Sequence, residues 1–147
     1  MADAIPDPLA ERLGPLLGRA HDAHRRLTLE ALAPLGMSPK GFGALAVIQA
    51  EGPLSQRRLS ARQGIDRTTT VAVVDELERL GAVERGSDPA DRRAHALHIT
   101  AQGRRLLARS RSAVVAAENV FLADLPEGEQ AQLRASLRAL VEAHSGP

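Results

Sequence analysis

The chain has 147 residues, of which 44% are hydrophobic and 25% charged, proportions that are ordinary for one globular domain. It contains two Phe but no Trp, Tyr or Cys, which excludes disulfides and thiolate metal sites. The acidic N-terminus does not have the pattern of a signal peptide, and the longest uncharged run, residues 41–50, is far too short to span a membrane. We therefore expect a single domain over residues 1–147, cytoplasmic and not membrane-bound, with a core of Leu, Val and Ala.

Two helices are predicted in the first third of the chain. Asp7-Pro8 is typical of a helix start, and apolar residues then recur at helical spacing as far as residue 35. Pro15 is expected to kink or restart this helix. Ser38-Pro39 predicts the start of the second helix, and Gly52-Pro53 predicts its end.

Residues 54–81 have the periodicity and the turn of a helix-turn-helix. Ser55 can cap a short helix that ends at Gly64, and Asp66 can cap the longer helix that follows and ends at Gly81. The longer helix has one apolar stripe, which we expect to be buried. Its members are Thr70, Val73, Val74, Leu77 and Leu80.

The start of this second helix carries the side chains that we expect to contact duplex DNA. A recognition helix enters the major groove by its N-terminal end, and three consecutive Thr are poor helix formers that a contact role would explain. Capping of the helix is an alternative role for Thr68, and the sequence favours the two roles equally. The DNA contacts predicted on the two helices are Ser55, Arg57, Arg58, Arg67, Thr68, Thr69 and Val71.

Residues 82–100 predict a β-hairpin, the wing. Val83 and Arg85 alternate before a polar turn, and Leu97 and Ile99 alternate after it. Arginines on a thin ribbon can insert into the narrow minor groove, where the potential is most negative, and a neighbouring carboxylate can orient them. The alternative is an ordinary solvated turn. The wing residues predicted to act on DNA are Asp91, Arg92 and Arg93, with His95 against a phosphate.

The charge distribution agrees with one DNA-binding face. Residues 55–111 carry 12 Arg and 7 Asp or Glu, which gives +5, whereas the rest of the chain carries 7 Lys or Arg and 11 Asp or Glu, which gives −4. A basic reading head within a nearly neutral chain is typical of proteins that meet the phosphates of DNA with one side only.

Two further helices are predicted after the wing, one starting at Thr100 and one at Pro126. Together with the first helix they carry more apolar stripe than one chain can cover, so we expect a homodimer that presents two reading heads to a palindrome. The predicted fold is mainly α with a small β-wing. Residues 38–100 form the winged helix-turn-helix, and residues 7–35 and 101–145 form the helical dimerisation part.

The segments IDRTTTVAVVDELERLGAVER (65–85), DPADRR (88–93) and LHITAQG (97–103) resemble the multiple-antibiotic-resistance regulator (MarR) family of bacterial transcription factors. The resemblance implies a dimeric winged helix-turn-helix protein, usually a repressor, whose hold on DNA is altered by a small molecule. By this resemblance Arg93 matches the wing arginine that reads the minor groove, and Asp91 the acidic residue that orients it. Arg67, Thr68 and Thr69 fall at the start of the recognition helix.

The sequence departs from the family pattern at two positions. Ala72 stands where many members have a longer polar side chain, so base contacts are not expected there. Gln63 replaces a commonly apolar residue at the end of the short helix, where looser packing is expected. The absence of Cys excludes the peroxide-sensing branch of the family.

The resemblance also places an effector between the dimerisation helices and the reading head. Its wall would include His21, His24, Arg25 and Phe42. A metal-responsive regulator that uses His21 and His24, three residues apart on a helix, is an alternative, although our main prediction includes neither a metal nor another cofactor. A module for protein–protein interaction is the second alternative. An enzyme is not expected, because the chain has neither a Gly-rich phosphate loop nor a nucleophile elbow.

Overall fold

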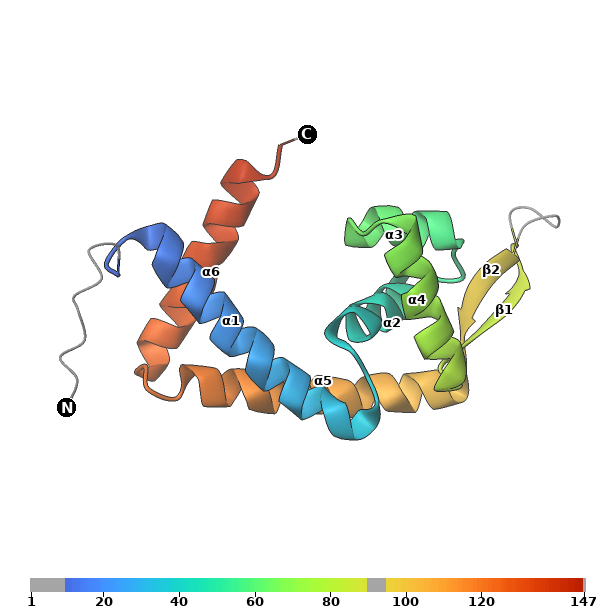
Figure 1. Cartoon of the computed structure of the whole chain (residues 1–147), viewed down its shortest axis with the longest axis horizontal. Helices are drawn as coiled ribbons and strands as arrows, with labels where there is room; N and C mark the ends of the chain where they lie inside the picture. Colours follow the sequence, from blue (N-terminus) through green and yellow to red (C-terminus); the bar gives the residue numbers. More distant parts are fainter. Residues whose placement is uncertain (1–9, 90–94, 147) are drawn as a thin grey trace.

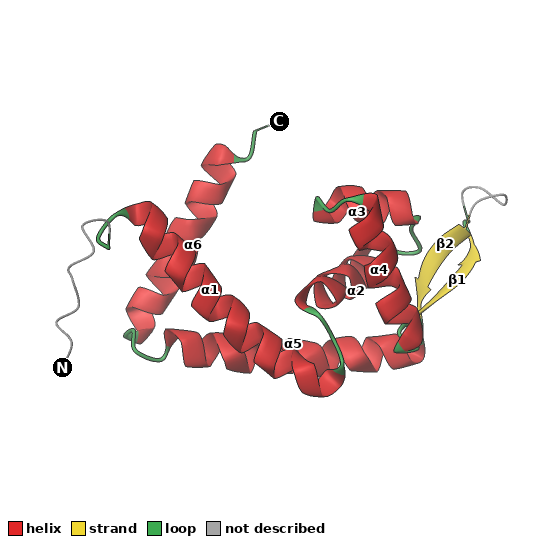
Figure 2. Ribbon diagram, viewed as in Figure 1, coloured by secondary structure: helices red, strands yellow, loops and turns green. Residues whose placement is uncertain are grey.

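The computed structural model describes residues 10–89 and 95–146. It contains α-helices and one two-stranded antiparallel sheet, which confirms the predicted fold class (Figures 1 and 2). The elements in chain order are α1 (Leu13–Leu32), the 3-10 turn η1 (Ala33–Leu35), α2 (Pro39–Glu51), α3 (Gln56–Gln63), α4 (Arg67–Arg79), β1 (Val83–Ser87), β2 (His95–Ile99), α5 (Ala101–Leu122) and α6 (Glu127–His144).

The long helix α5 joins two groups of elements (Figure 1). At its N-terminal end lie α2, α3, α4 and the strands, which form the winged helix-turn-helix. Toward its other end α1 packs along it, and α6 turns away from its C-terminus. The winged helix-turn-helix, which we call the reading head, is therefore connected to α1 and α6 through α5 and through the chain between α1 and α2.

The structure confirms most of the predicted helix starts. Each of these starts depends on a capping residue only a few positions away in the chain. The hydroxyl of Ser38 accepts a hydrogen bond from the N–H of Gly41 at 2.9 Å, and that of Ser55 accepts one from Arg58 at 3.3 Å. The first helix differs from its prediction. It begins at Leu13 after a turn, not at Asp7-Pro8, two residues that lie outside those described.

Pro15 does not restart this helix, which runs without interruption from Leu13 to Leu32. The proline lies in the first turn, where backbone N–H groups have no partner inside the helix, so the missing N–H costs nothing.

The hydrophobic core lies in the reading head, between α2, α4, the sheet and the start of α5. Four of the five residues predicted on the stripe of α4 are buried, and Leu80 is half-buried against the same core. The larger apolar side chains buried in this core are Leu32, Met37, Leu45, Ile48, Leu54, Leu59, Val73, Val74, Leu77, Val83, Leu97 and Leu107.

The recognition helix α4 is attached to the first turn of α2 by a carboxylate. Glu76 accepts a hydrogen bond from the backbone N–H of Ser38 at 2.7 Å, which places a negative charge at the positive end of α2. Gly41 is buried beside it, and a Cβ there would overlap the carboxylate oxygen of Glu76. The absence of a side chain at Gly41 thus allows α4 to dock on α2.

The wing is joined to the reading head at its base. Val83 pairs with Ile99 and Ser87 with His95, so the two strands are in antiparallel register over their whole described length, as predicted. Leu54 forms an additional bridge to Leu97, through backbone hydrogen bonds of 2.9 and 3.4 Å. The orientation of the wing relative to α3 is therefore fixed by backbone contacts.

The apolar stripe of α5 is covered within one chain, by α1 and α2. Leu107, Ser110 and Ala117 of this stripe are buried, and so is Gly103, which lies against Ala82 and Ile99. In contrast, no described residue of α6 is buried. Among the described residues no single helix is long and apolar enough to cross a membrane, although α1 with η1 and α2 pass that test as a pair bent by 73°.

Candidate nucleic-acid interface

Five of the seven DNA contacts predicted on α3 and α4 are exposed, and we call these five residues the reading face. It consists of Arg57, Arg58, Arg67, Thr68 and Val71, all of which are exposed. None of the three arginines pairs with a described carboxylate, so their charges are available to phosphates. Ser55 is half-buried, and its hydroxyl is used as the cap of α3.

The three threonines at the start of α4 have different environments. Asp66 accepts hydrogen bonds from the backbone N–H of Thr69 at 2.9 Å and from its hydroxyl at 2.6 Å. The hydroxyl of Thr70 donates to the carbonyl of Asp66 at 2.8 Å. Thr69 is half-buried, and its hydroxyl is engaged by the carboxylate of Asp66. Thr68 is exposed and is the threonine best placed to contact a partner.

The capping carboxylate predicts a pH dependence of stability. The hydroxyl and the backbone N–H of Thr69 lower the pKa of the Asp66 carboxyl below its ordinary value. The resulting stabilisation is complete above the unfolded-state pKa of about 4 and is lost as the pH falls through the lower folded-state pKa. We expect Asp66→Ala to lower the melting temperature at neutral pH, and the difference from the wild type to shrink below about pH 4. Thermal unfolding followed by circular dichroism tests this, and a difference that is the same at both ends of the range would refute the role of the charge.

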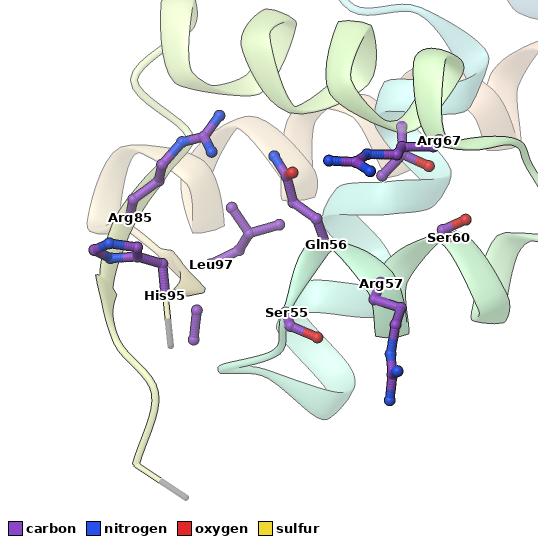
Figure 3. A pocket seen from close by; sticks show the side chains of 10 residues that line it. Ser55, Gln56, Arg57, Ser60, Arg67, Arg85, His95 and Leu97 are labelled. Carbon is purple, nitrogen blue, oxygen red and sulfur yellow. The ribbon is translucent and has the colours of Figure 1, made fainter. Parts of the chain in front are cut away.

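A hollow of about 550 Å³ separates α3 and the start of α4 from the wing (Figure 3). Its floor contains the buried residues Ala96 and Leu97 of β2, and its rim carries arginines from three elements. Gln56, Ser60 and Arg85 also line this hollow, although no sequence pattern predicted them there. The lining residues are Ser55, Gln56, Arg57, Ser60, Arg67, Thr70, Arg85, His95, Ala96 and Leu97.

Arg85 on β1 is held by two carboxylates of α4. Its guanidinium donates to Glu78 through two hydrogen bonds of 3.0 and 3.1 Å and lies 3.7 Å from Asp75. These contacts raise the pKa of Arg85, with the hydrogen bond to Glu78 as the largest cause. The pair connects the wing to the recognition helix and leaves little free positive charge on that side of the hollow.

The predicted wing residues Asp91, Arg92 and Arg93 lie outside the described residues. His95 is exposed at the rim of the hollow. Near the end of the wing stem, Nε2 of His98 donates to the carbonyl of Ser87 at 3.0 Å.

The four residues predicted to line an effector site occupy different environments. His24 is half-buried and its ring packs edge-on against Phe121 of α5, with ring centres 5.5 Å apart. His21 and Arg25 are exposed, whereas Phe42 packs on the core. A second hollow, of about 410 Å³, is lined by Gln49, Arg104, Leu107, Ala108 and Arg111, so neither hollow includes these four residues.

The histidine pair would need help to bind a metal. In the part of the chain that the structure describes, no three His, Cys, Asp or Glu side chains gather as a metal site would require. His21 and His24 could therefore bind an ion only with a ligand from outside these residues.

Gln63, where looser packing was expected, makes a polar contact with α2. Its Nε2 donates to the carbonyl of Lys40 at 3.3 Å and lies where a side chain at Gly43 would be, 2.9 Å from an added Cβ. The glutamine thus packs α3 against α2 by a polar contact where an apolar one was expected, although its Oε1 is buried without a described partner.

Comparison with known sequences agrees with the arrangement of these elements. A sequence model of the MarR family matches residues 35–94. A protein of Thauera aromatica, named for transcriptional regulation of the hcr operon, is 33% identical over 141 residues, which cover 95% of this chain and 85% of that protein. The HTH-type transcriptional repressor Rv2887 of Mycobacterium tuberculosis is 30% identical over 128 residues, covering 87% of this chain and 92% of the repressor.

Solved structures give the same result. The crystal structure of Rv2887 in complex with DNA superimposes with a TM-score of 0.75 at 30% identity, over 87% of this chain and 96% of that one. That of CouR from Rhodococcus jostii RHA1 bound to p-coumaroyl-CoA gives a TM-score of 0.75 at 31% identity, over 90% of this chain and 93% of CouR. The chain belongs to the MarR family of winged helix-turn-helix transcriptional regulators.

Proposed function

We propose that the protein is a dimeric repressor that binds a pseudo-palindromic operator and is released from it by a small-molecule effector. The observation that carries the proposal is the reading face, where three exposed arginines without a described carboxylate partner lie on α3 and at the capped start of α4. Cations in this position favour the phosphates of a duplex, and the exposed Thr68 and Val71 can reach base edges in the major groove. The proposal assigns the protein a regulatory and not a catalytic role.

The same division of labour is proposed for the rest of the chain. Residues 38–100 read DNA, and residues 7–35 and 101–145 hold two copies together. Rv2887, a relative in structure and sequence, was crystallised with DNA, and CouR was crystallised with an acyl-coenzyme A ligand. We infer that an effector also acts on this protein, in the cytoplasm, and the wall predicted for it remains His21, His24, Arg25 and Phe42.

Two alternatives remain to be tested against this proposal. A winged-helix module for protein–protein interaction would have no need of unpaired arginines on α3 and α4. A metal-responsive regulator would require His21 and His24 to change DNA binding when zinc is added. If alanine at both histidines leaves the response to zinc unchanged, the metal-responsive alternative is excluded.

Selection of binding sites from random duplex DNA tests the function. We expect enrichment of a pseudo-palindrome whose half-sites lie about one helical turn apart. Binding to the enriched duplex should weaken by orders of magnitude between about 50 and 200 mM salt, because several arginines displace counterions from phosphates. A folded protein that enriches no sequence, or whose weak binding is insensitive to salt, would favour the protein-interaction alternative.

A further inference from the structure

We propose that the hollow between α3, α4 and the wing is a seat for one phosphate of the DNA backbone, and that Gln56 is the residue that holds it. This inference deepens the proposed function and rests on it. Neither the helical pattern nor the charge pattern of the sequence indicates this role for Gln56.

The amide of Gln56 has an unsatisfied hydrogen-bond donor. Gln56 is the first residue of α3, and its Nε2 is buried with no hydrogen-bond partner among the described residues. A buried donor without an acceptor is unfavourable and is rare in folded proteins. The residue as a whole is half-buried and lines the open hollow, so a rotation of its side chain brings the covered donor to an acceptor supplied by a partner.

Most of the other polar groups of the hollow are already engaged within the protein. The hydroxyl of Ser60 donates to the carbonyl of Ile65 at 2.6 Å, and that of Thr70 donates to the carbonyl of Asp66 at 2.8 Å. Arg85 is neutralised by Glu78 and Asp75. Gln56, Arg57 and Arg67 therefore remain to receive an occupant, together with the exposed His95 at the rim.

The amide of Gln56 lies among the arginines that line the hollow. In Figure 3 it lies between the guanidinium groups of Arg67 and Arg85, with Arg57 on the same side of the hollow as Arg67. An occupant there meets an amide donor and an unpaired cation, Arg67, but no free carboxylate, since those of Asp75 and Glu78 are engaged with Arg85. This combination favours an anionic oxygen.

The anionic oxygen that fits this position is that of a DNA phosphate. A recognition helix in the major groove and a wing in the adjacent minor groove lie on either side of one sugar-phosphate strand. The hollow lies between α4 and β2, so this strand must pass over it. One phosphate of the strand is therefore placed beside Gln56 Nε2 and Arg67.

The test compares wild type with Gln56→Leu on the operator obtained by selection, intact or with single phosphates replaced by neutral methylphosphonates. Leucine has a similar size and removes the donor, so the melting temperature should stay the same or rise. DNA affinity should nevertheless fall by about tenfold, equally for operator and random duplex, since a phosphate contact carries no sequence information. Stability and binding would then change independently, which loss of a structural contact would not produce.

Two further readouts locate the contact. Gln56→Leu should leave the salt dependence of binding unchanged because it removes no charge, whereas Arg67→Ala should reduce the slope by about one. At one phosphate in each half-site, the methylphosphonate should weaken the wild type but add little to the loss in Gln56→Leu. Gln49→Leu, on the exposed surface of α2, serves as the control and should bind as the wild type.

Three results would overturn the inference. Gln56→Leu could bind as tightly as the wild type, or every methylphosphonate could act equally on both proteins. Loss of discrimination between operator and random duplex would make Gln56 a base contact and not a phosphate contact. Failure of the wild type to bind any duplex would instead refute the proposed function, and is distinguished by the wild-type titration alone.

Discussion

Replacing Gly103 by alanine is expected to lower the free energy of unfolding by about 1–3 kcal/mol or more, although alanine is the better helix former. Gly103 is buried in the first turn of α5, where an added Cβ would overlap the backbone carbonyl of Ala82. That carbonyl cannot move freely, because it accepts the backbone N–H of Thr100 at 3.0 Å. The clash is with backbone and not with a flexible side chain, so it cannot be relieved by a change of rotamer.

Urea unfolding of Gly103→Ala beside Gly128→Ala measures this effect against a matched control. Gly128 lies in the first turn of α6, and an added Cβ there meets nothing within 4 Å. In the control, alanine should increase stability by up to about 1 kcal/mol, because glycine loses more backbone entropy on folding. The two substitutions should thus have opposite signs, and a Gly103→Ala protein as stable as the wild type would refute the packing described for this junction.

The same junction shows what the sequence can predict. Thr100 was expected to start a helix, and its hydroxyl accepts the N–H of Gly103 at 2.9 Å. Such caps depend on residues three apart in the chain, so the starts of α2, α3, α4 and α5 could be predicted from local pattern. The reason for a glycine at position 103 could not, because it lies in the carbonyl of Ala82, 21 positions earlier in the chain.

Other features of the site depend on contacts that no local pattern reveals. Helical spacing placed Thr69 on the outside, but the choice of its hydroxyl between solvent and the Asp66 carboxylate was decided by the geometry of the cap. The pairing of Arg85 with Glu78 depends on how the wing folds back on α4. Gln56 differs from its neighbours only through the hollow beside it, which forms when three separate elements meet.

The sequence predicts a dimer, but only the structure shows which apolar residues a single chain leaves exposed. Periodicity correctly identified apolar stripes on the first, fifth and sixth helices, but it could not tell which of them another part of the same chain covers. The stripe of α5 is covered by α1 and α2, whereas that of α6 is not. Large apolar residues left exposed include Leu13, Leu16 and Leu17 on α1 and Leu137, Leu140 and Val141 on α6, which are between 41% and 66% exposed. Leu29, Val115 and Val120 are exposed as well.

Leu140→Glu is therefore expected to weaken the proposed dimer by about a thousandfold. Leu140 is 50% exposed in the single chain and lies beside Leu137 and Val141 on one face of α6. In a two-fold dimer each substitution occurs twice, so a cost of about 2 kcal/mol for each buried carboxylate is doubled. Ala139→Glu places the same charge on the opposite face of the same helix and should leave the dimer intact. Sedimentation equilibrium over a range of protein concentrations measures both.

The effect on DNA binding follows from the geometry of two linked reading heads. Once one head is bound, the second is held close to its half-site, so a dimer gains affinity that neither head has alone. Leu140→Glu should lose most of its affinity for the full operator but bind a single half-site as the wild type does, because α6 lies apart from the reading face (Figure 1). Equal loss on the half-site would mean that the substitution disturbs the reading head itself, and an undiminished dimer would show that two copies associate through another surface.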